Sequence, residues 1–381
     1  MNHQPHSSPI ALGATDASNN LSVWSQHPRG GTRWRGVLCF MASSIFLCAG
    51  LAQPLSAEEQ VPHVFSAILE NDFLYNPAPG SHQDRHYTQG LKLIYLDRGE
   101  PAPWWAKGLL LKKVNDWLPN VWMDTKTENY GLILGQNMYT PEDDRAVGAI
   151  TGDRPYAAWL YLGLAIQRRG ETAGHIPVLE SFELDLGVIG PEAQGQFAQD
   201  TWHHWRHIPT FEGWKNQLNT EPAFGLKYGR AWRIAISEKS SHYFDVIPNI
   251  GADLGTVRVS GNLGVTTRVG WNLPNDFGVQ TIDSPIVLSD GPRRGPIGIY
   301  LFGQVEGRAV GRNAFLDGNL WQESAHVDKK PFVADFIYGV GLSFGKYFEA
   351  SWSFLTRTQE FEGQKGNDQF GSLLVKFKCG F

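Results

Sequence analysis

Short runs in which apolar residues alternate with small or polar residues recur along the chain from about residue 64 onward. The clearest run is SLLVKFKCGF, at the end of the chain. In an extended conformation Leu373, Val375 and Phe377 lie on one face of this segment. Ser372 and Lys376 lie on the other. A strand of a soluble sandwich alternates in the same way, so this run alone predicts a strand and not its surroundings.

About twelve such runs can be counted, most of them roughly 9 to 13 residues long, as is typical of membrane β-strands. They cover residues 64–71, 86–97, 128–137, 156–168, 179–190, 223–237, 243–255, 263–271, 298–309, 333–345, 346–357 and 372–381. An even number suits a closed barrel, in which no strand edge faces lipid. The final Phe381 resembles the terminal assembly signal of outer-membrane barrels. The sequence therefore predicts an all-β fold, a transmembrane antiparallel β-barrel of about twelve strands.

Three other parts of the chain depart from this pattern. Residues 191–218 break the period of two and predict a short helical insertion near 192–207, followed by a loop. Pro191 suits the first turn of that helix. Residues 98–127 and 272–297 are rich in Pro, Gly and Asp and predict long loops.

Composition agrees with a strand-rich protein and excludes one class of partner. The chain has 42 Gly and 12% aromatic residues but only 19% charged residues, which favours strands and turns over long helices. The formal net charge is −5, and no basic cluster of the kind that binds nucleic acid is present. We therefore expect no nucleic-acid partner.

The N-terminal region predicts export. Arginines precede an uncharged stretch, residues 36–57, which ends in small residues. This pattern is typical of a secretory signal peptide cleaved before Glu58. A single membrane-spanning helix is the alternative, but the apolar part is shorter than the ~20 residues that a helix needs to cross a bilayer. We expect a signal peptide at 1–57 and an outer-membrane barrel domain at 58–381.

Two patterns suggest chemistry that their context does not favour. Residues 341–345, GLSFG, match the Gly-x-Ser-x-Gly pattern of serine hydrolases, which requires a sharp strand-to-helix turn. Ser343 instead lies between two strand-like runs, so we interpret it as a strand residue. His203 and His207 have the spacing of two zinc ligands on one helical face, but no glutamate completes a metalloprotease motif.

A polar cluster is expected where the first two strands meet. Glu70, Asn71 and Asp72 end the first run, and HYTQG, residues 86–90, begins the second. In an antiparallel hairpin the end of one strand lies beside the start of the next, which brings Thr88 close to this group. Strict alternation turns neighbouring side chains to opposite faces, so Asn71 and Asp72 share a site only if the strand bends there. A solvated strand end is the alternative interpretation.

A second candidate lies on the expected helix. Gln199 and His203 are four residues apart and therefore share one face. A lone histidine is more often structural than catalytic, so the combination with the first cluster decides its interpretation.

That combination is similar to the calcium-dependent lipid A deacylases of the bacterial outer membrane. The resemblance covers most of the chain after the signal region and rests on six pieces in the family's order. These are END at 70–72, HYTQG at 86–90, QNMYTPED at 136–143, GDRPYAAWL at 152–160, GVIGP at 187–191 and GWKNQL at 213–218. The resemblance implies a twelve-stranded barrel that hydrolyses the ester of the 3′-linked acyloxyacyl group of lipid A in lipopolysaccharide. We expect the barrel to be a monomer, although the sequence does not give the oligomeric state.

The resemblance also implies roles for individual residues. It assigns His203 as general base, Asn71 to oxyanion stabilisation together with Ca²⁺, and Asp72 as a ligand of Ca²⁺. Thr88 and Gln199 would orient the histidine or the substrate. These residue types suit the chemistry, because a histidine titrates near neutral pH and Ca²⁺ prefers oxygen ligands.

One position departs from the family pattern. Pro209 stands where the family has an acidic residue just after the helix, and the nearest acid is Glu212. Either Glu212 joins Asp72 as a calcium ligand, or the calcium site is built differently. A non-enzymatic barrel, as a small channel or an inactive relative, is the alternative function. A serine-dependent phospholipase would need a serine beside a histidine on the barrel wall.

Overall fold

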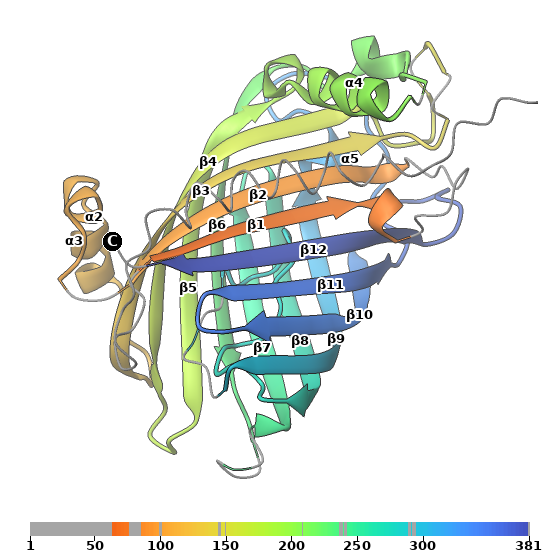
Figure 1. Cartoon of the computed structure of the whole chain (residues 1–381). Helices are drawn as coiled ribbons and strands as arrows, with labels where there is room; N and C mark the ends of the chain where they lie inside the picture. Colours follow the sequence, from red (N-terminus) through yellow and green to blue (C-terminus); the bar gives the residue numbers. More distant parts are fainter. Residues whose placement is uncertain are drawn as a thin grey trace, which may run out of the picture. The chain divides into compact units, whose positions relative to one another are not determined.

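A computed structural model of the chain describes residues 63–75, 85–98, 101–143, 146–148, 150–207, 209–235, 239, 242–288, 291 and 295–379. The expected signal peptide and Phe381 lie outside these residues. The described chain forms a closed antiparallel barrel in which each strand pairs with its neighbours in sequence and β1 pairs with β12 (Figure 1). The strands are β1 His63–Asn71, β2 His86–Arg98, β3 Asp124–Thr140, β4 Ala157–Glu171, β5 Pro177–Ile189, β6 Glu221–Trp232, β7 Phe244–Gly255, β8 Arg258–Trp271, β9 Ile297–Asn313, β10 Phe332–Phe344, β11 Phe348–Arg357 and β12 Asp368–Cys379.

Short helices lie between the strands. They are η1 Asp72–Leu74, α2 Trp104–Gly108, α3 Leu111–Trp117, η2 Pro191–Ala193, α4 Gly195–Arg206, η3 Gly213–Asn216 and α5 Ala314–Asp317. The predicted insertion near 192–207 is confirmed, although Pro191 begins a 3₁₀ turn and not the α-helix itself. The expected loop at 98–127 is wrong in part, because it contains α2 and α3. No helix among the described residues is long and apolar enough to cross a membrane.

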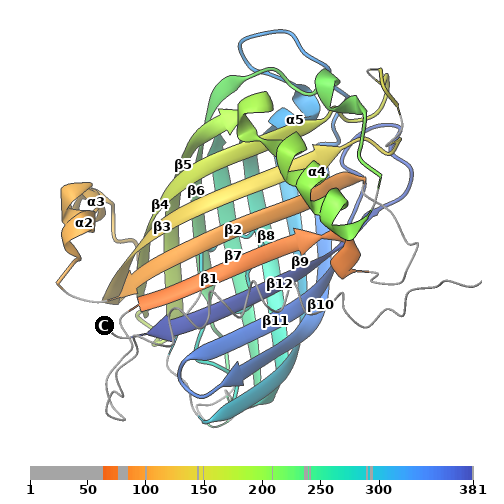
Figure 2. The ribbon, with the colours of Figure 1, turned by 45° about the horizontal axis from the view of Figure 1, so that its top comes forward.

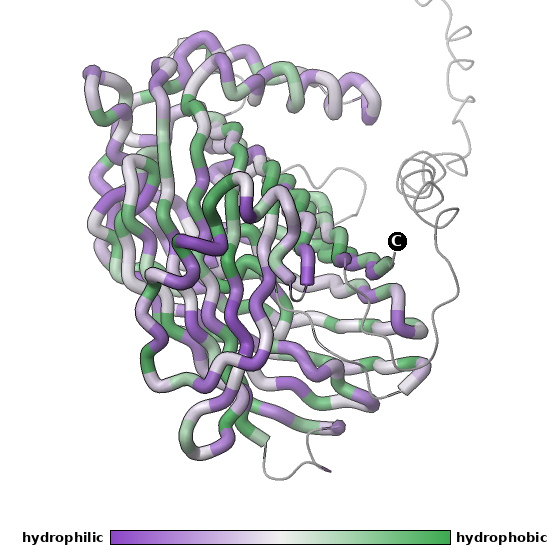
Figure 3. The backbone as a smooth tube through the Cα atoms, turned by 90° about the vertical axis from the view of Figure 1, so that its left-hand side faces the viewer, coloured by the Kyte–Doolittle hydropathy of each residue, from purple (hydrophilic) through white to green (hydrophobic). Residues whose placement is uncertain are grey.

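The period of two directs side chains to opposite faces of the wall. Leu162, Leu263 and Leu301 point outward and are 61–67% exposed. Lys92 and Glu183 point inward and form a buried ion pair, with 2.8 Å between Nζ and Oε1. Figure 3 shows the resulting alternation of hydrophobic and hydrophilic residues along the strands. An apolar outer surface around a polar interior is the arrangement expected of a barrel in a membrane.

The two ends of the barrel differ. The end that holds the first residue of β1 and the last of β12 also carries α2 and α3 (Figure 1), and we call it the terminal end. The opposite end carries η1, α4 and α5 (Figure 2), and we call it the α4 end. The 31 residues of 190–220, between β5 and β6, include α4 and the two 3₁₀ turns around it.

The connection between β8 and β9 enters the barrel. It leaves β8 at the terminal end, yet the backbone N–H of Ile282 donates to Glu70 Oε1 over 2.9 Å at the α4 end of β1. The N–H of Val287 donates to Ser181 Oγ in β5 over 3.3 Å. We call residues 273–288 the inner segment. The prediction of a long loop at 272–297 was therefore incomplete, because the inner segment within it occupies the interior.

Ion pairs hold the inner segment to the wall. Asp283 lies 2.9 Å from Arg258, 2.8 Å from Arg357 and 3.5 Å from Arg308. Asp335, on β10, pairs with the last two of these arginines at 2.8 and 2.6 Å. Because every member is buried or nearly so, loss of one carboxylate leaves arginine charge without compensation in a region poor in water.

Replacing Asp283 by Asn is expected to lower the free energy of unfolding by about 3 kcal/mol, because it breaks buried ion pairs without changing side-chain size. The measurement is the midpoint of urea unfolding of the refolded protein in detergent. Asp116→Asn is the matched control, since Asp116 is 58% exposed and pairs with Lys112 on the surface of α3. It should change stability by no more than about 0.5 kcal/mol. Equal effects of the two variants would contradict a structural role for the inner segment.

Candidate active site

The three polar residues that end β1 have three different environments. Glu70 points into the barrel, where its carboxylate accepts hydrogen bonds from Tyr87 Oη at 2.9 Å and from the inner segment. Asn71 is the N-cap of η1, and its Oδ1 accepts the N–H of Phe73 at 2.9 Å. Asp72 is the first residue of that turn and is half-buried. The strand therefore ends at Asn71, which removes the objection that alternation would separate Asn71 from Asp72.

Asn71 and Thr88 meet at the α4 end, as the hairpin geometry predicts. Asn71 Nδ2 donates to the carbonyl oxygen of Thr88 over 2.9 Å, and both residues are at most 5% exposed. The register between β2 and β3 shifts between Tyr87 and Gln89, so Thr88 occupies an irregularity of the ladder. Its hydroxyl lies 2.6 Å from that of Thr140 at the end of β3. A bulge of this kind re-aims a side chain, which places the Thr88 hydroxyl on the same side of the wall as Thr140.

His86 anchors the start of β2. Its Nδ1 lies 2.5 Å from Asp368 Oδ1 on β12, and its Nε2 lies 3.5 Å from Asp153 Oδ1 in the connection between β3 and β4. Its backbone has φ of 60°, in the left-handed region. Burial raises the pKa of Asp153, but the hydrogen bond with His86 and bonds from the N–H groups of Glu142 and Arg154 outweigh it and lower the pKa below its usual range. The end of the barrel wall around Thr88 is therefore stabilised by the contacts of His86 with Asp368 and Asp153.

Helix α4 is held against the outward side of the wall. Its first residue, Gly195, packs so closely on Ala158 of β4 that a Cβ there would lie 2.4 Å from the Ala158 Cβ. Trp214, in η3, is fully buried and contacts the ring of Tyr156 at 5.1 Å between centroids. Gln136 Nε2, on β3, donates to the carbonyl of residue 193 over 2.7 Å. Figure 2 shows α4 running across the ends of β4, β3 and β2 toward η1.

Gln199 and His203 occupy the buried face of α4, and both are 1% exposed. Gln199 Oε1 accepts a hydrogen bond from Trp214 Nε1 at 2.6 Å. Gln199 Nε2 is buried without a hydrogen-bond partner among the described residues. A buried amide nitrogen of this kind is costly unless a ligand or water completes its hydrogen bonding.

His203 has a defined tautomer. Its Nδ1 lies 2.7 Å from the carbonyl oxygen of Pro209, which can only accept, so the proton resides on Nδ1. Of the two ring nitrogens, Nε2 is the one that does not face this carbonyl. The ring of Phe211 packs edge-on at 5.1 Å between centroids. Pro209, the position at which the sequence departs from the family pattern, thus orients the histidine through its backbone.

One contact joins the helix to the end of β1. The guanidinium of Arg206, the last residue of α4, lies 3.9 Å from the centroid of the Phe73 ring in η1. The turn that begins with Asp72 and the helix that carries His203 therefore meet at the α4 end. Sequence reasoning missed Arg206, Phe73 and Trp214. The GWKNQL motif contains Trp214, but nothing in the sequence indicated which element it would contact.

The carboxylates expected to bind metal do not form a preassembled cluster in the part of the chain that the structure describes. No group of three or more His, Cys, Asp or Glu side chains there has metal-binding proximity. Glu212 is exposed and precedes η3, one residue after Phe211. His203 is buried and His207 is exposed, so this pair does not form a zinc site within that part. Ser343 lies within β10 opposite Glu349 of β11, which confirms its interpretation as a strand residue.

Comparison with known proteins agrees with this architecture. A family model described as "Outer membrane protein LpxR" matches residues 39–379. The solved structure of LpxR from Salmonella typhimurium is 21% identical, with a TM-score of 0.64, and the match covers 83% of this chain and 99% of that one. The translocator domain of the autotransporter NalP from Neisseria meningitidis is 9% identical over 90% of this chain and 96% of its own, with a TM-score of 0.41. No curated protein sequence matches the chain.

The family model spans nearly all of the barrel and every motif on which the resemblance rests. The structural match extends over almost the whole of the Salmonella barrel and supports the same fold. The chain is thus an outer-membrane protein, and it belongs to the LpxR family of outer-membrane proteins.

Proposed function

We propose that this protein is an outer-membrane hydrolase that removes the 3′-linked acyloxyacyl group of lipid A by ester hydrolysis. The observation that carries the proposal is the hydrogen bond from His203 Nδ1 to the Pro209 carbonyl, on a helix whose last residue contacts η1, the turn that Asn71 caps. A buried, oriented histidine on a helix that meets the strand end with Asn71 suits water activation at an ester. A simple pore has no use for such a set.

The position of this set relative to lipid supports the same substrate class. Leu132 and Leu134 of β3 are exposed on the outer surface, and Thr140 follows them on the same face of the strand. Thr140 and the Thr88 hydroxyl beside it therefore lie on the membrane side of the wall and not on the lumen side. The α4 end carries the longest connection, as the outer side of such barrels does, so we assign it to the face where lipid A resides.

In the proposed reaction His203 Nε2 accepts a proton from water as the water oxygen attacks the ester carbonyl carbon. The Asn71 amide already donates one hydrogen to the Thr88 carbonyl, and its second hydrogen stabilises the negative oxygen. The bond between the carbonyl carbon and the 3′-oxygen of the sugar then breaks. His203 returns its proton to the departing 3′-hydroxyl, which leaves lipid A with a free hydroxyl and the acyloxyacyl group as a carboxylic acid.

Thr88 and Gln199 are positioning residues in this proposal. The Thr88 hydroxyl, which lies 2.6 Å from that of Thr140, directs the substrate or water, and Gln199 Nε2 supplies a buried donor that an ester oxygen of the substrate or a water satisfies. Contacts within the protein already fix the Thr88 and Gln199 side chains, so neither side chain has to rearrange when the lipid binds.

Ca²⁺ is part of the proposal, with Asp72 as its carboxylate ligand and Glu212 as a second, exposed carboxylate near the histidine. The donor set fits only in part, since the described residues include one half-buried carboxylate at the site and Ca²⁺ takes about 6 to 8 oxygens, some from main-chain carbonyls and water. When bound, the ion would supply positive charge near the developing oxyanion.

The alternative of a small channel has less support. The inner segment and its ion pairs cross the described lumen, and the cavity between Lys227, Asp253 and Arg258 is only about 20 Å³. We also infer a monomer, because β1 and β12 pair within one chain and leave no strand edge for a partner.

Replacing His203 by Ala is expected to reduce lipid A deacylation by roughly 10²–10⁴-fold, because it removes the general base. His204→Ala is the matched control, since His204 is the next residue but is exposed. Mass spectrometry of lipid A from cells that express each variant gives the measurement. Wild-type activity in the His203 variant, with the barrel inserted, would refute the proposed base.

The Thr88 hydroxyl can be tested by paired substitutions. Thr88→Val keeps the shape and removes the hydroxyl, and we expect a roughly ten-fold lower rate, as for one lost hydrogen bond. Thr88→Ser should retain most activity. If valine and serine give the same rate in the lipid A assay, the hydroxyl has no positioning role.

Calcium binding can be followed without activity. A ligand that binds only the folded state raises the unfolding midpoint, by an amount that grows with the logarithm of its concentration relative to its dissociation constant. We expect calcium to raise the thermal midpoint of the wild type and of Glu192→Gln, an exposed acid at the start of the same connection. Asp72→Asn should abolish the shift, and Glu212→Gln should weaken it. A full shift in Asp72→Asn would remove Asp72 from the calcium site.

A further inference from the structure

The segment between β2 and β3 packs against the outside of the barrel at the terminal end. Ala106 and Leu111, from α2 and α3, form a buried cluster with Tyr130 of β3 and Ile166 of β4. Arg168 Nε, on β4, donates to Asn115 Oδ1 over 2.7 Å and so ties α3 to the wall. Figure 1 shows the two helices beside the start of the barrel strands. Along the barrel axis, α2 and α3 therefore lie where the wall leaves the membrane.

The other face of this segment is exposed and apolar. Trp104, Trp117 and Trp122 are 82–86% exposed, and Leu109 and Leu110 are 50 and 53% exposed. Tryptophan at this level of a barrel is typical of the membrane–water interface. The exposed face continues the outward apolar surface of the strands, so it adjoins lipid on the same side of the wall.

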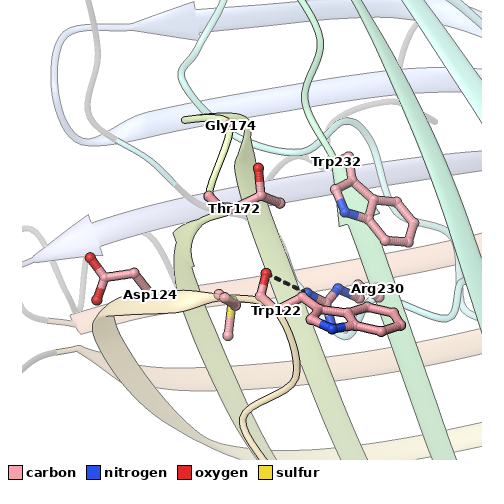
Figure 4. A pocket seen from close by; sticks show the side chains of 8 residues that line it. Trp122, Asp124, Thr172, Gly174, Arg230 and Trp232 are labelled. Atoms are coloured by element: carbon pink, nitrogen blue, oxygen red, sulfur yellow. Dashed lines mark hydrogen bonds between the residues drawn. The ribbon is translucent and has the colours of Figure 1, made fainter.

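A groove opens beside this segment. Its volume is about 720 Å³, and Trp122, Thr172, Gly174, Arg230 and Trp232 line it (Figure 4). The groove lies between the start of β3, the turn after β4 and the end of β6. Its lining is mostly apolar, and its polar members are Asp124, Thr172 and Arg230, the last of which lies within β6.

Arg230 faces outward and is only partly neutralised. It follows Leu226, which is 44% exposed, by four residues along β6, so both side chains point out of the barrel. Arg230 is 5% exposed, and its Nε has no hydrogen-bond partner among the described residues. Its other nitrogens lie 3.5 Å from the Trp122 carbonyl and 3.5 Å from Glu180.

Arg230 shares its carboxylate partner with a second arginine. Glu180 also lies 3.6 Å from Arg168, so two guanidinium groups face this one carboxylate. Asp124 also lines the groove, but it pairs with Lys126 at 2.5 Å. A buried guanidinium with an unused N–H and a shared carboxylate partner favours an anionic oxygen ligand.

We propose that this groove binds the phosphate of a glycerophospholipid, with Arg230 as the phosphate ligand and Trp122 and Trp232 flanking the headgroup. The acyl chains would lie on the apolar outer surface of the wall. With the α4 end facing outward, as proposed above, this lipid belongs to the inner leaflet of the outer membrane. The segment at 101–123 then holds the barrel at the depth of that leaflet.

The test is native mass spectrometry of the detergent-purified full chain titrated with dioleoylphosphatidylglycerol. We expect the wild type to retain one lipid and Arg230→Gln to bind it roughly ten-fold more weakly, as for loss of a charged hydrogen bond. Lys126→Gln, which removes a neighbouring exposed charge, should bind within two-fold of the wild type. Dioleoylglycerol, which lacks the phosphate, should bind no more tightly than the phospholipid binds to Arg230→Gln.

Two results would overturn the assignment. One is equal phospholipid affinity in the wild type and Arg230→Gln, and the other is equal affinity for phospholipid and dioleoylglycerol. If Arg230→Gln does not fold, Trp122→Ala takes its place in the comparison with the wild type, and equal phospholipid affinity would again overturn the assignment. That side chain is 86% exposed, so its removal does not threaten folding. Lipid A deacylation should be unchanged in folded Arg230→Gln and in Trp122→Ala, so failure of this proposal is distinguishable from failure of the deacylase proposal.

Discussion

The pairing of β1 with β12 is the constraint on which the rest of this structure depends. Inside a membrane every backbone N–H and C=O must find a partner within the protein, and only a closed sheet provides partners for all strands. Nine residue pairs, from His63 with Cys379 to Asn71 with Gly371, close the wall. Closure fixes one face of every strand outward and the other inward, which separates a lipid-facing surface from a polar lumen.

The lumen is then an interior that must be filled and neutralised. The inner segment fills it, and Glu70 links this segment to β1 through Ile282 and to β2 through Tyr87. Glu70, which directly precedes Asn71 and Asp72, thus has a structural role in the lumen. It supports the strand end from inside while Asn71 and Asp72 leave the strand on the other side. Interior packing and the outer site share one short stretch of chain.

The outer surface carries both proposed lipid contacts. At the α4 end, the helix that carries His203 is docked on the wall and contacts η1 through Arg206. At the terminal end, α2 and α3 lie on the wall beside Arg230. A barrel with a filled lumen has its functional surface outside, where a lipid substrate or ligand can approach sideways from the membrane without leaving it. Polar groups on that surface are costly next to lipid, so their presence in two clusters points to function.

The sequence by itself determined the barrel, because a period of two along a strand is a local property and every strand had to satisfy it. It also indicated the END and HYTQG cluster, since residues that join consecutive antiparallel strands must lie close together. Only the tertiary structure decided the rest. The Pro209 carbonyl orients His203, and a backbone carbonyl leaves no residue signature. Likewise, Ile282 lies 212 residues from Glu70, and no local pattern reveals that a loop rich in Gly, Pro and Asp turns inward. Such contacts form between distant segments only after the barrel has closed around them.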